Sequence, residues 1–179
     1  QARKQLVREI NRRIPEAGPA WDHYKLATNL YKEKLVRDGV YRWQQDKIPN
    51  EKTGRDKTTG GDPDLFKFFA ERFLSLSVQG RGRVGILIPA AFYASEGCKG
   101  LRRMVLDKAR IQHLYSYENR RGVFPSVYYR FKFCALVVAN AELDDEAEFS
   151  AAFMLHDPAF LDASPAQQAG RVVKLSPKF

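Results

Sequence analysis

The chain has 179 residues, of which 44% are hydrophobic, so it is long and apolar enough to bury the core of one domain. Thirty Lys and Arg against 21 Asp and Glu give a net charge of +9, which favours a polyanionic partner. No long uncharged apolar run is present, which argues against a membrane span, and the charged start argues against a signal peptide. The two cysteines lack metal-type spacing, so we expect a reduced cytoplasmic setting and no metal site.

Residues 1–61 are expected to be a helical segment followed by a basic mobile loop. Apolar residues recur at helical spacing in residues 2–14 and 20–37, with residues 17–19 as a turn between them. The basic faces of both helices could lie along DNA, but ordinary solvated helix surface is the better explanation. Residues 50–61 are almost free of apolar side chains, which is typical of a mobile loop.

Residues 62–141 predict an α/β layered domain. A helix is expected to begin with Asp62 as its cap and Pro63 at its first position. Apolar side chains lie around most of its circumference, so we expect it to be well buried. Residues 84–88 form an apolar run without alternation, which is typical of a central parallel strand covered on both faces. The other expected elements are a helix and two strands, over residues 97–107, 111–117 and 133–139.

Residues 142–179 form the third expected part of the chain. An acidic linker over residues 142–148 precedes a strand at the sheet edge over residues 149–155, and the start of a further segment follows. Upstream, residues 80–85 match the letters G-x-G-x-x-G. They follow a helix and lead into a strand, the reverse of the order in a dinucleotide-binding motif, so they predict a turn.

The loop over residues 118–130 combines cations with aromatic side chains. The cations are Arg120, Arg121 and Arg130, and the aromatic residues are Phe124, Tyr128 and Tyr129. Cations interleaved with aromatics suit a surface that binds phosphates and stacks bases. The pattern also fits a solvated loop whose phenylalanine fills the core, and from the residues alone this second interpretation is preferred.

No nucleophile motif and no cluster of metal-ligand type occurs in the sequence. The three histidines lie far apart, and we assign none a role. Asp62, Asp64 and Glu118 could act as general bases, although helix capping explains the first two more simply.

An ordered series of short segments resembles one protein family. The segments are DLFKFFAER (64–72), GRVGILIP (82–89), LRR (101–103), YENR (117–120), VFPSV (123–127), RFKF (130–133) and VVKLSP (172–177). In this order they resemble the C-terminal half of the catalytic domain of adenine-specific DNA methyltransferases. The most similar kinds are the large methylase polypeptides of bacterial restriction-modification and phage-defence systems. The resemblance implies an α/β fold, the second half of a class I (Rossmann-like) methyltransferase domain with a helical N-terminal segment.

The resemblance also implies an activity and a site. These enzymes move a methyl group from S-adenosylmethionine to the exocyclic amine of an adenine flipped out of double-stranded DNA. Phe124 would stack on the flipped base. Phe69 would lie against the adenine of the cofactor, and plain core packing of its ring is an equal alternative. The residues that would bind DNA are Arg120, Arg121, Arg130, Lys132 and Tyr128, with the four cations meeting phosphates or ordering the hairpin.

Two motifs of that family are absent from this sequence. One is the Gly-rich turn that binds the cofactor, and the other is the Asn/Asp-Pro-Pro-aromatic tetrapeptide that holds the target amine. Because both normally precede the matched part, we expect this chain to act with the upstream half of the same domain. Alone, it is expected not to methylate and to bind S-adenosylmethionine weakly or not at all. A non-catalytic DNA-binding module and a basic α/β domain that only assembles with a protein partner are the open alternatives.

Overall fold

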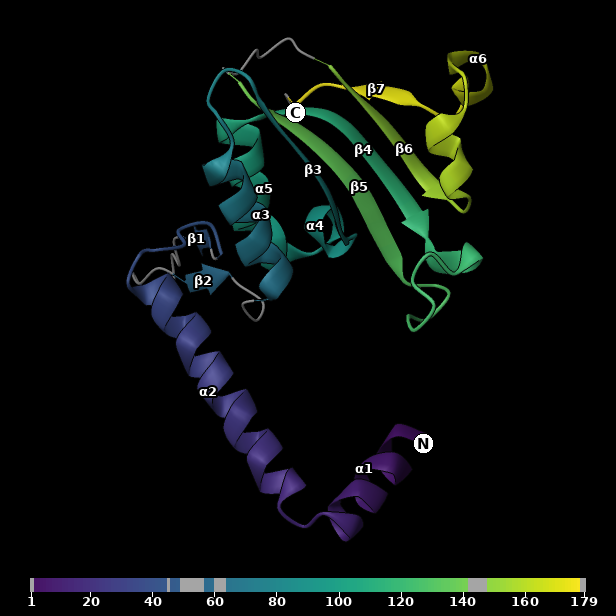
Figure 1. Ribbon diagram of the computed structural model, residues 1–179. Helices are drawn as coiled ribbons and strands as arrows, with labels where there is room; N and C mark the ends of the chain where they lie inside the picture. The colour runs from purple at the N-terminus through teal and green to yellow at the C-terminus, as the bar shows by residue number, and fades with distance from the viewer. Residues whose placement is uncertain (1, 45, 49–56, 60–63, 142–147, 178–179) are drawn as a thin grey trace. The chain divides into compact units, whose positions relative to one another are not determined.

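The computed structural model describes residues 2–44, 46–48, 57–59, 64–141 and 148–177 (Figure 1). The chain forms two compact units, Gln1–Arg42 and Trp43–Phe179. The first unit is a pair of helices, α1 (Ala2–Arg13) and α2 (Ala17–Arg37). Both helices were expected from the apolar spacing, but the predicted turn over residues 17–19 is wrong. Pro19 lies in the first turn of α2, where a backbone N–H has no acceptor within the helix and proline is tolerated.

The second unit is built on a mixed five-stranded sheet in the order β3-β5-β4-β6-β7. Its strands are β3 (Gly82–Pro89), β4 (Arg110–Glu118), β5 (Lys132–Asn140), β6 (Phe149–Leu155) and β7 (Val173–Leu175). β5 is antiparallel to both β3 and β4, so β3 and β4 run in the same direction. β6 is parallel to β4, and β7 is antiparallel to β6. A separate ribbon pairs β1 (Asp46–Ile48) with β2 (Lys57–Thr59).

Two strand positions differ from the prediction. β3 was expected at the centre of a parallel sheet, but among the described strands it pairs only with β5, in antiparallel register, and Leu87 is 56% exposed. β6 was expected at the sheet edge, but it lies between β4 and β7. The physical reason for the first difference is that β5 returns from a hairpin after β4 and inserts between β3 and β4. Chain order alone does not reveal such an insertion.

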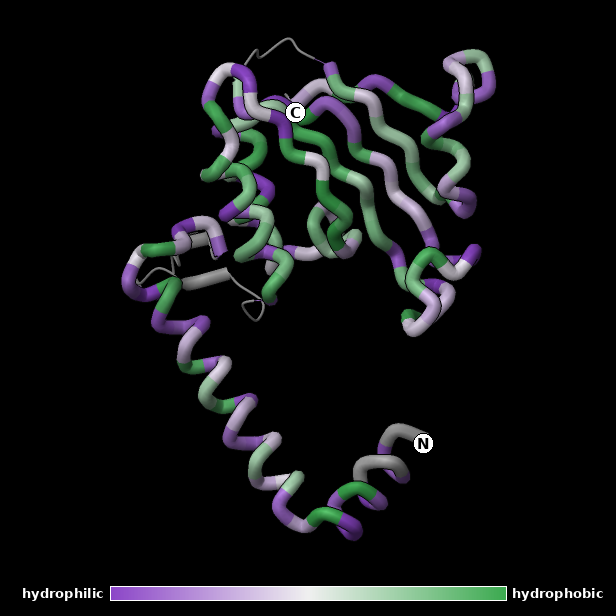
Figure 2. The backbone as a smooth tube through the Cα atoms, viewed as in Figure 1, coloured by the Kyte–Doolittle hydropathy of each residue, from purple (hydrophilic) through white to green (hydrophobic). Residues whose placement is uncertain are grey.

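Helices cover one face of the sheet, and a smaller cluster covers part of the other. α3 (Leu65–Leu76) and α5 (Lys99–Lys108) bury Leu74, Leu101 and Met104 against β3 and β5. The second cluster contains Tyr115, Tyr117, Phe133, Ala152 and Leu155. Successive side chains of a strand point to opposite faces, so Phe133 and Cys134 of β5 place the two clusters on opposite sides of the sheet. Figure 2 shows the hydrophobic residues concentrated on β3, β5 and the adjacent helices.

Short helical turns connect these elements. They are α4 (Ala91–Ala94), η1 (Glu96–Cys98), η2 (Asn119–Arg121), η3 (Pro158–Asp162) and α6 (Pro165–Gln168). The expected α/β class is confirmed, with the strands and helices predicted between residues 84 and 139 all present.

The helix α3 is buried on one side only, which corrects the prediction that it is covered around most of its circumference. Phe68 and Leu74 are buried. Four large apolar side chains are 43% to 62% exposed, namely Leu65, Phe69, Phe73 and Leu76. Their spacing of four, four and three residues places them in one continuous stripe along the helix, which we call the α3 stripe.

The start of α3 also differs from the prediction. The helix begins at Leu65 with Asp64 as its cap residue, and the Asp64 side chain makes no capping hydrogen bond. The predicted cap, Asp62, and the predicted first helical residue, Pro63, lie outside the described residues.

Candidate nucleic-acid interface

The hairpin over residues 119–131 joins β4 to β5 and carries most of the predicted DNA-binding residues. It begins with the helical turn η2, which ends at Gly122 in the left-handed conformation (φ 66°). A hydrogen bond from Val127 N to Phe124 O (3.0 Å) closes a second turn. The hairpin therefore has a defined backbone path with its own internal hydrogen bonds.

Asn119 organises this hairpin from the inside. Its side chain is buried, and Nδ2 donates to the carbonyl oxygens of Phe124 (2.8 Å) and Val127 (2.9 Å), while Oδ1 accepts from Phe124 N (2.9 Å). Its backbone N–H donates to Phe131 O at 2.9 Å. One side chain thus satisfies three backbone groups of the loop. Sequence reasoning gave Asn119 no role, although asparagine at the start of a turn is a known signal for such bonds.

The ring of Phe124 is half-buried and packs on the second core cluster. It meets Phe133 edge to face with ring centroids 5.0 Å apart, and Phe133 stacks on Tyr117 at 5.5 Å. This geometry supports the interpretation in which the phenylalanine fills the core. The same packing fixes the position of the Phe124 ring in the hairpin. Stacking of this ring on a base is compatible with that position and stays a prediction.

The outer side of the hairpin presents two tyrosines and a stacked arginine. Tyr128 is 63% exposed, and its ring meets that of Tyr129 with centroids 4.7 Å apart. The guanidinium carbon of Arg130 lies 5.5 Å from the centroid of the Tyr129 ring. Arginine stacked on an aromatic face can still donate from its rim to an anion, which suits this surface to phosphates.

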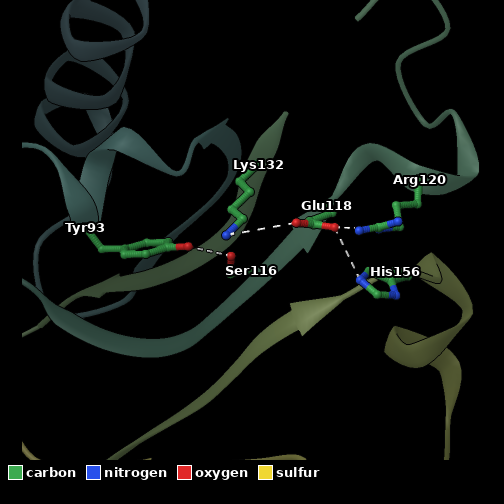
Figure 3. A network of polar contacts seen from close by, with 6 residues as sticks. All are labelled: Tyr93, Ser116, Glu118, Arg120, Lys132 and His156. Atoms are coloured by element: carbon green, nitrogen blue, oxygen red, sulfur yellow. Dashed lines mark hydrogen bonds and ion pairs between the residues drawn. The ribbon is translucent and has the colours of Figure 1, made fainter. Parts of the chain in front are cut away.

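Three side chains surround the carboxylate of Glu118 at the end of β4 (Figure 3). Arg120 Nε lies 2.6 Å from one carboxylate oxygen, His156 Nε2 lies 3.5 Å from the same oxygen, and Lys132 Nζ lies 4.0 Å from the other. The hydrogen bond and the charge of Arg120, aided by Lys132 and His156, hold the pKa of Glu118 below its ordinary value of 4.5. A carboxylate held in its charged form is a poor proton acceptor, so the geometry does not favour Glu118 as a general base.

We expect Glu118→Gln to lower the melting temperature modestly at neutral pH. Because the pKa of Glu118 is lowered in the folded state, its contribution is present above the ordinary value of 4.5 and is lost as the pH falls through the lowered pKa. The melting temperatures of the two proteins should therefore converge in acid. Glu33→Gln, at an exposed residue of α2, is the matched control and should show no such difference. A gap between wild type and Glu118→Gln that persists unchanged in acid would contradict the assignment.

The predicted cations of the hairpin divide by what they face. Arg120 and Lys132 face Glu118, and Arg121 Nη2 lies 3.6 Å from the carboxylate of Asp157, with both side chains exposed. Of the two roles left open by the sequence, ordering the hairpin is the one that the geometry supports for Arg120 and Lys132. Arg130, on the Tyr129 ring, is better placed to meet a phosphate.

Phe69, the predicted cofactor contact, is separate from this hairpin. It lies on α3 within the α3 stripe, is 56% exposed, and stacks on Phe73 with ring centroids 5.8 Å apart. Plain core packing therefore does not describe it. The helix α3 packs on the first core cluster and Phe124 on the second, so the structure places their elements on opposite faces of the sheet.

The segment after β3 is held by two buried or half-buried cations that sequence reasoning missed. Arg102 Nη1 donates to the carbonyl oxygens of Phe92 (2.8 Å) and Ser95 (2.6 Å). Lys67, which is 2% exposed, donates from Nζ to Gly97 O at 2.7 Å. The Tyr93 hydroxyl is 2.7 Å from Ser116 Oγ on β4, as Figure 3 shows. These bonds fix the loop that follows the carboxyl end of β3, a position where open α/β sheets place ligand-facing loops.

Across the described parts of the chain, no group of three or more His, Cys, Asp or Glu could hold a metal ion. Over the same residues, no helix is both long and apolar enough to cross a membrane. Cys98 and Cys134 are buried free thiols, and burial raises the pKa of Cys134 to about 12.

The fold and the hairpin define an α/β domain whose aromatic and cationic loop connects two antiparallel strands of a mixed sheet. Residues 39–124 match the Eco57I restriction-modification methylase family. The resemblance to methyltransferases is thereby confirmed over this stretch, which contains α3, β3, α5, β4 and the hairpin as far as Phe124. Over this stretch the chain is similar to restriction-modification methylases.

One solved structure similar to this chain is a protein of Listeria monocytogenes assigned to the class I S-adenosylmethionine-dependent methyltransferases. The sequences are 17% identical, the TM-score is 0.40, and the match covers 64% of this chain and 36% of that chain. The chain thus matches little more than a third of the length of that protein. No curated protein matches this sequence.

Proposed function

We propose that this chain is the base-pocket half of a DNA adenine-N6 methyltransferase that uses S-adenosylmethionine, in a restriction-modification or phage-defence system. The observation that carries the proposal is the match of residues 39–124 to a restriction-modification methylase family, which ends at Phe124. The hairpin supports it, because a fixed aromatic ring and exposed tyrosines lie beside cations at one end of the sheet. Such a combination suits a flipped base and the phosphates around it.

The described residues offer only part of a site for S-adenosylmethionine. The exposed ring of Phe69 could lie against the adenine of the cofactor. The sequence has neither the Gly-rich turn nor the Asn/Asp-Pro-Pro-aromatic motif expected for such an enzyme. One aromatic face gives too few contacts to hold the cofactor, so the residues present do not form a complete site, and we assign no step of transfer to this chain alone.

The partner that we propose is the upstream half of the same methyltransferase domain. Among the described strands, β3 has a partner on one side only. Leu87 of this strand is 56% exposed, and the helix α3, which carries the exposed α3 stripe, packs against the same strand. An unpaired strand edge next to an apolar stripe is the kind of surface that a continuing sheet and its helices would bury. The alternative of a purely assembling domain shares this surface but predicts no methyl transfer.

The position of the transferred methyl group in the DNA tests the proposed function. A polypeptide that contains the upstream half and this chain would be incubated with duplex DNA and methyl-labelled S-adenosylmethionine, and the DNA then digested to nucleosides. We expect the label on N6 of adenine. Label on cytosine would contradict the adenine assignment, and unlabelled DNA would favour the non-catalytic alternatives.

A further inference from the structure

A second basic feature lies at the end of the sheet away from the hairpin. It is a surface depression of about 360 Å³ beside the turn that leads into β3. Its lining residues are Gly80, Arg81, Gly82, Arg83, Arg110, Gln112, Ala139 and Ala141. We call it the arginine depression. Since Arg110 and Glu118 are the two ends of β4, and strand residues rise by about 3.3 Å each, it lies about 26 Å from the hairpin.

The turn that forms one wall is set by two glycines. Gly80 has a φ of 84°, which favours glycine, and its N–H donates to Asn140 O at 2.6 Å. Gly82 N donates to Val78 O at 2.6 Å, and a Cβ on Gly82 would lie only 2.6 Å from the backbone of Val78. Residues 79–81 thus form a tight turn that leads into β3 at Gly82. The turn carries Arg81, and the start of β3 carries Arg83.

Strand register brings the third arginine to the same place. Arg83 on β3 and Arg110 on β4 both pair with Ala139 of β5, one from each side. Two strand spacings separate their backbones, about 10 Å. A β-bulge between Ile111 and His113 shifts the register of β4 directly after this point, and the bulged residue, Gln112, also lines the depression.

Two arginines of the arginine depression carry a charge that no described carboxylate pairs with. Arg81 and Arg83 are exposed and make no ion pair with any described residue, and the lining contains no carboxylate. In the hairpin, by contrast, Arg120 and Arg121 face carboxylates. Arginine presents several N–H donors in a planar fork that matches phosphate oxygens, so an anion of this shape is the expected occupant.

We propose that the arginine depression binds a phosphodiester group of duplex DNA, as a second backbone contact in addition to the hairpin. The proposal rests on the proposed function in one respect, that the polyanionic partner is DNA. This contact would set how the protein is oriented on the DNA, because phosphate contacts orient a protein on a duplex without reading bases. Two contacts about 26 Å apart would align the sheet along the helix axis of the DNA.

The test is the salt dependence of binding to a short duplex by the full chain. The double variant R81Q/R83Q removes two charges from the depression, and R72Q/R103Q is the matched control, since Arg72 and Arg103 are exposed residues of α3 and α5. Over roughly 50 to 200 mM salt, we expect the slope of log affinity against log salt to fall by about 0.9 or more in R81Q/R83Q. The affinity at the lowest salt should fall about tenfold, while the control keeps its slope.

The outcomes separate the two proposals. Wild-type binding with an unchanged slope in R81Q/R83Q would overturn the arginine depression and leave the hairpin contact standing. Absence of wild-type binding would overturn the depression together with the DNA contact of the proposed function. Equal losses in R81Q/R83Q and R72Q/R103Q would show an effect of net charge alone and would also overturn the depression. Circular dichroism checks that each variant is folded.

Discussion

Asn119→Asp is expected to destabilise the chain by about 3 kcal/mol, although the two side chains have the same shape. The Nδ2 group that donates to Phe124 O and Val127 O becomes an oxygen that faces two carbonyl oxygens. Each buried carbonyl that loses its donor costs about 1–3 kcal/mol, and the new oxygen repels both. The hairpin should open, and the backbone around Phe124 should lose its fixed path. Urea unfolding measures the loss as a fall in midpoint.

The same substitution at Asn140 provides the control. Asn140 is half-buried and donates one hydrogen bond, from Nδ2 to Ser77 O at 2.8 Å. Because one bond is lost instead of two, Asn140→Asp should cost about 1 kcal/mol. A loss at Asn119 no larger than the loss at Asn140 would show that the hairpin does not depend on this side chain.

Phe124→Ala is expected to lower methyl transfer by the longer polypeptide about 100-fold, because stacking of a base on an aromatic ring is worth about 1–3 kcal/mol. The structure adds a complication, since the same ring packs edge to face on Phe133. Loss of that contact should also lower the stability by about 1 kcal/mol. A fall in rate after Phe124→Ala alone would therefore not separate stacking from packing.

Two further substitutions at Phe124 make the separation. Phe124→Tyr keeps the aromatic face, whereas Phe124→Leu keeps apolar volume and removes the face. If the ring stacks on the target base, the Tyr variant should transfer methyl groups at close to the wild-type rate and the Leu variant should lose most of it, with similar unfolding midpoints. Wild-type transfer by the Leu variant would show that Phe124 only fills the core, and would remove it from the base pocket.

Most elements of the second unit could be predicted from the sequence, and the errors have a common physical origin. The apolar run over residues 84–88 was predicted to be a central parallel strand covered on both faces, and the apolar circumference of α3 to be buried. In the structure Leu87 and the α3 stripe are exposed, and β3 has one described partner. Hydrophobic patterning reports how much surface a segment can bury, not which chain buries it. Both errors fall on the surface that we propose for the upstream half.

The features that could not be predicted depend on strand order and on long-range polar contacts. Arg83 and Arg110 line the same depression because both pair with Ala139 of β5, the strand that lies between theirs. Asn119 gains its importance from carbonyl groups five and eight residues away, whose positions exist only once the hairpin is formed. Glu118 was considered as a general base from its position alone, and the cations around it became visible only in the structure.

The measurement that tests the central claim most directly is transfer of a labelled methyl group to duplex DNA by three samples. These are this chain alone, the upstream half alone, and the polypeptide that contains both. We predict transfer only by the polypeptide that contains both, because the cofactor turn and the amine-holding motif are absent from this sequence, whereas it contains the hairpin that we propose as the base pocket. Transfer by this chain alone would contradict the account, since it would mean that the residues described here already form a complete active site.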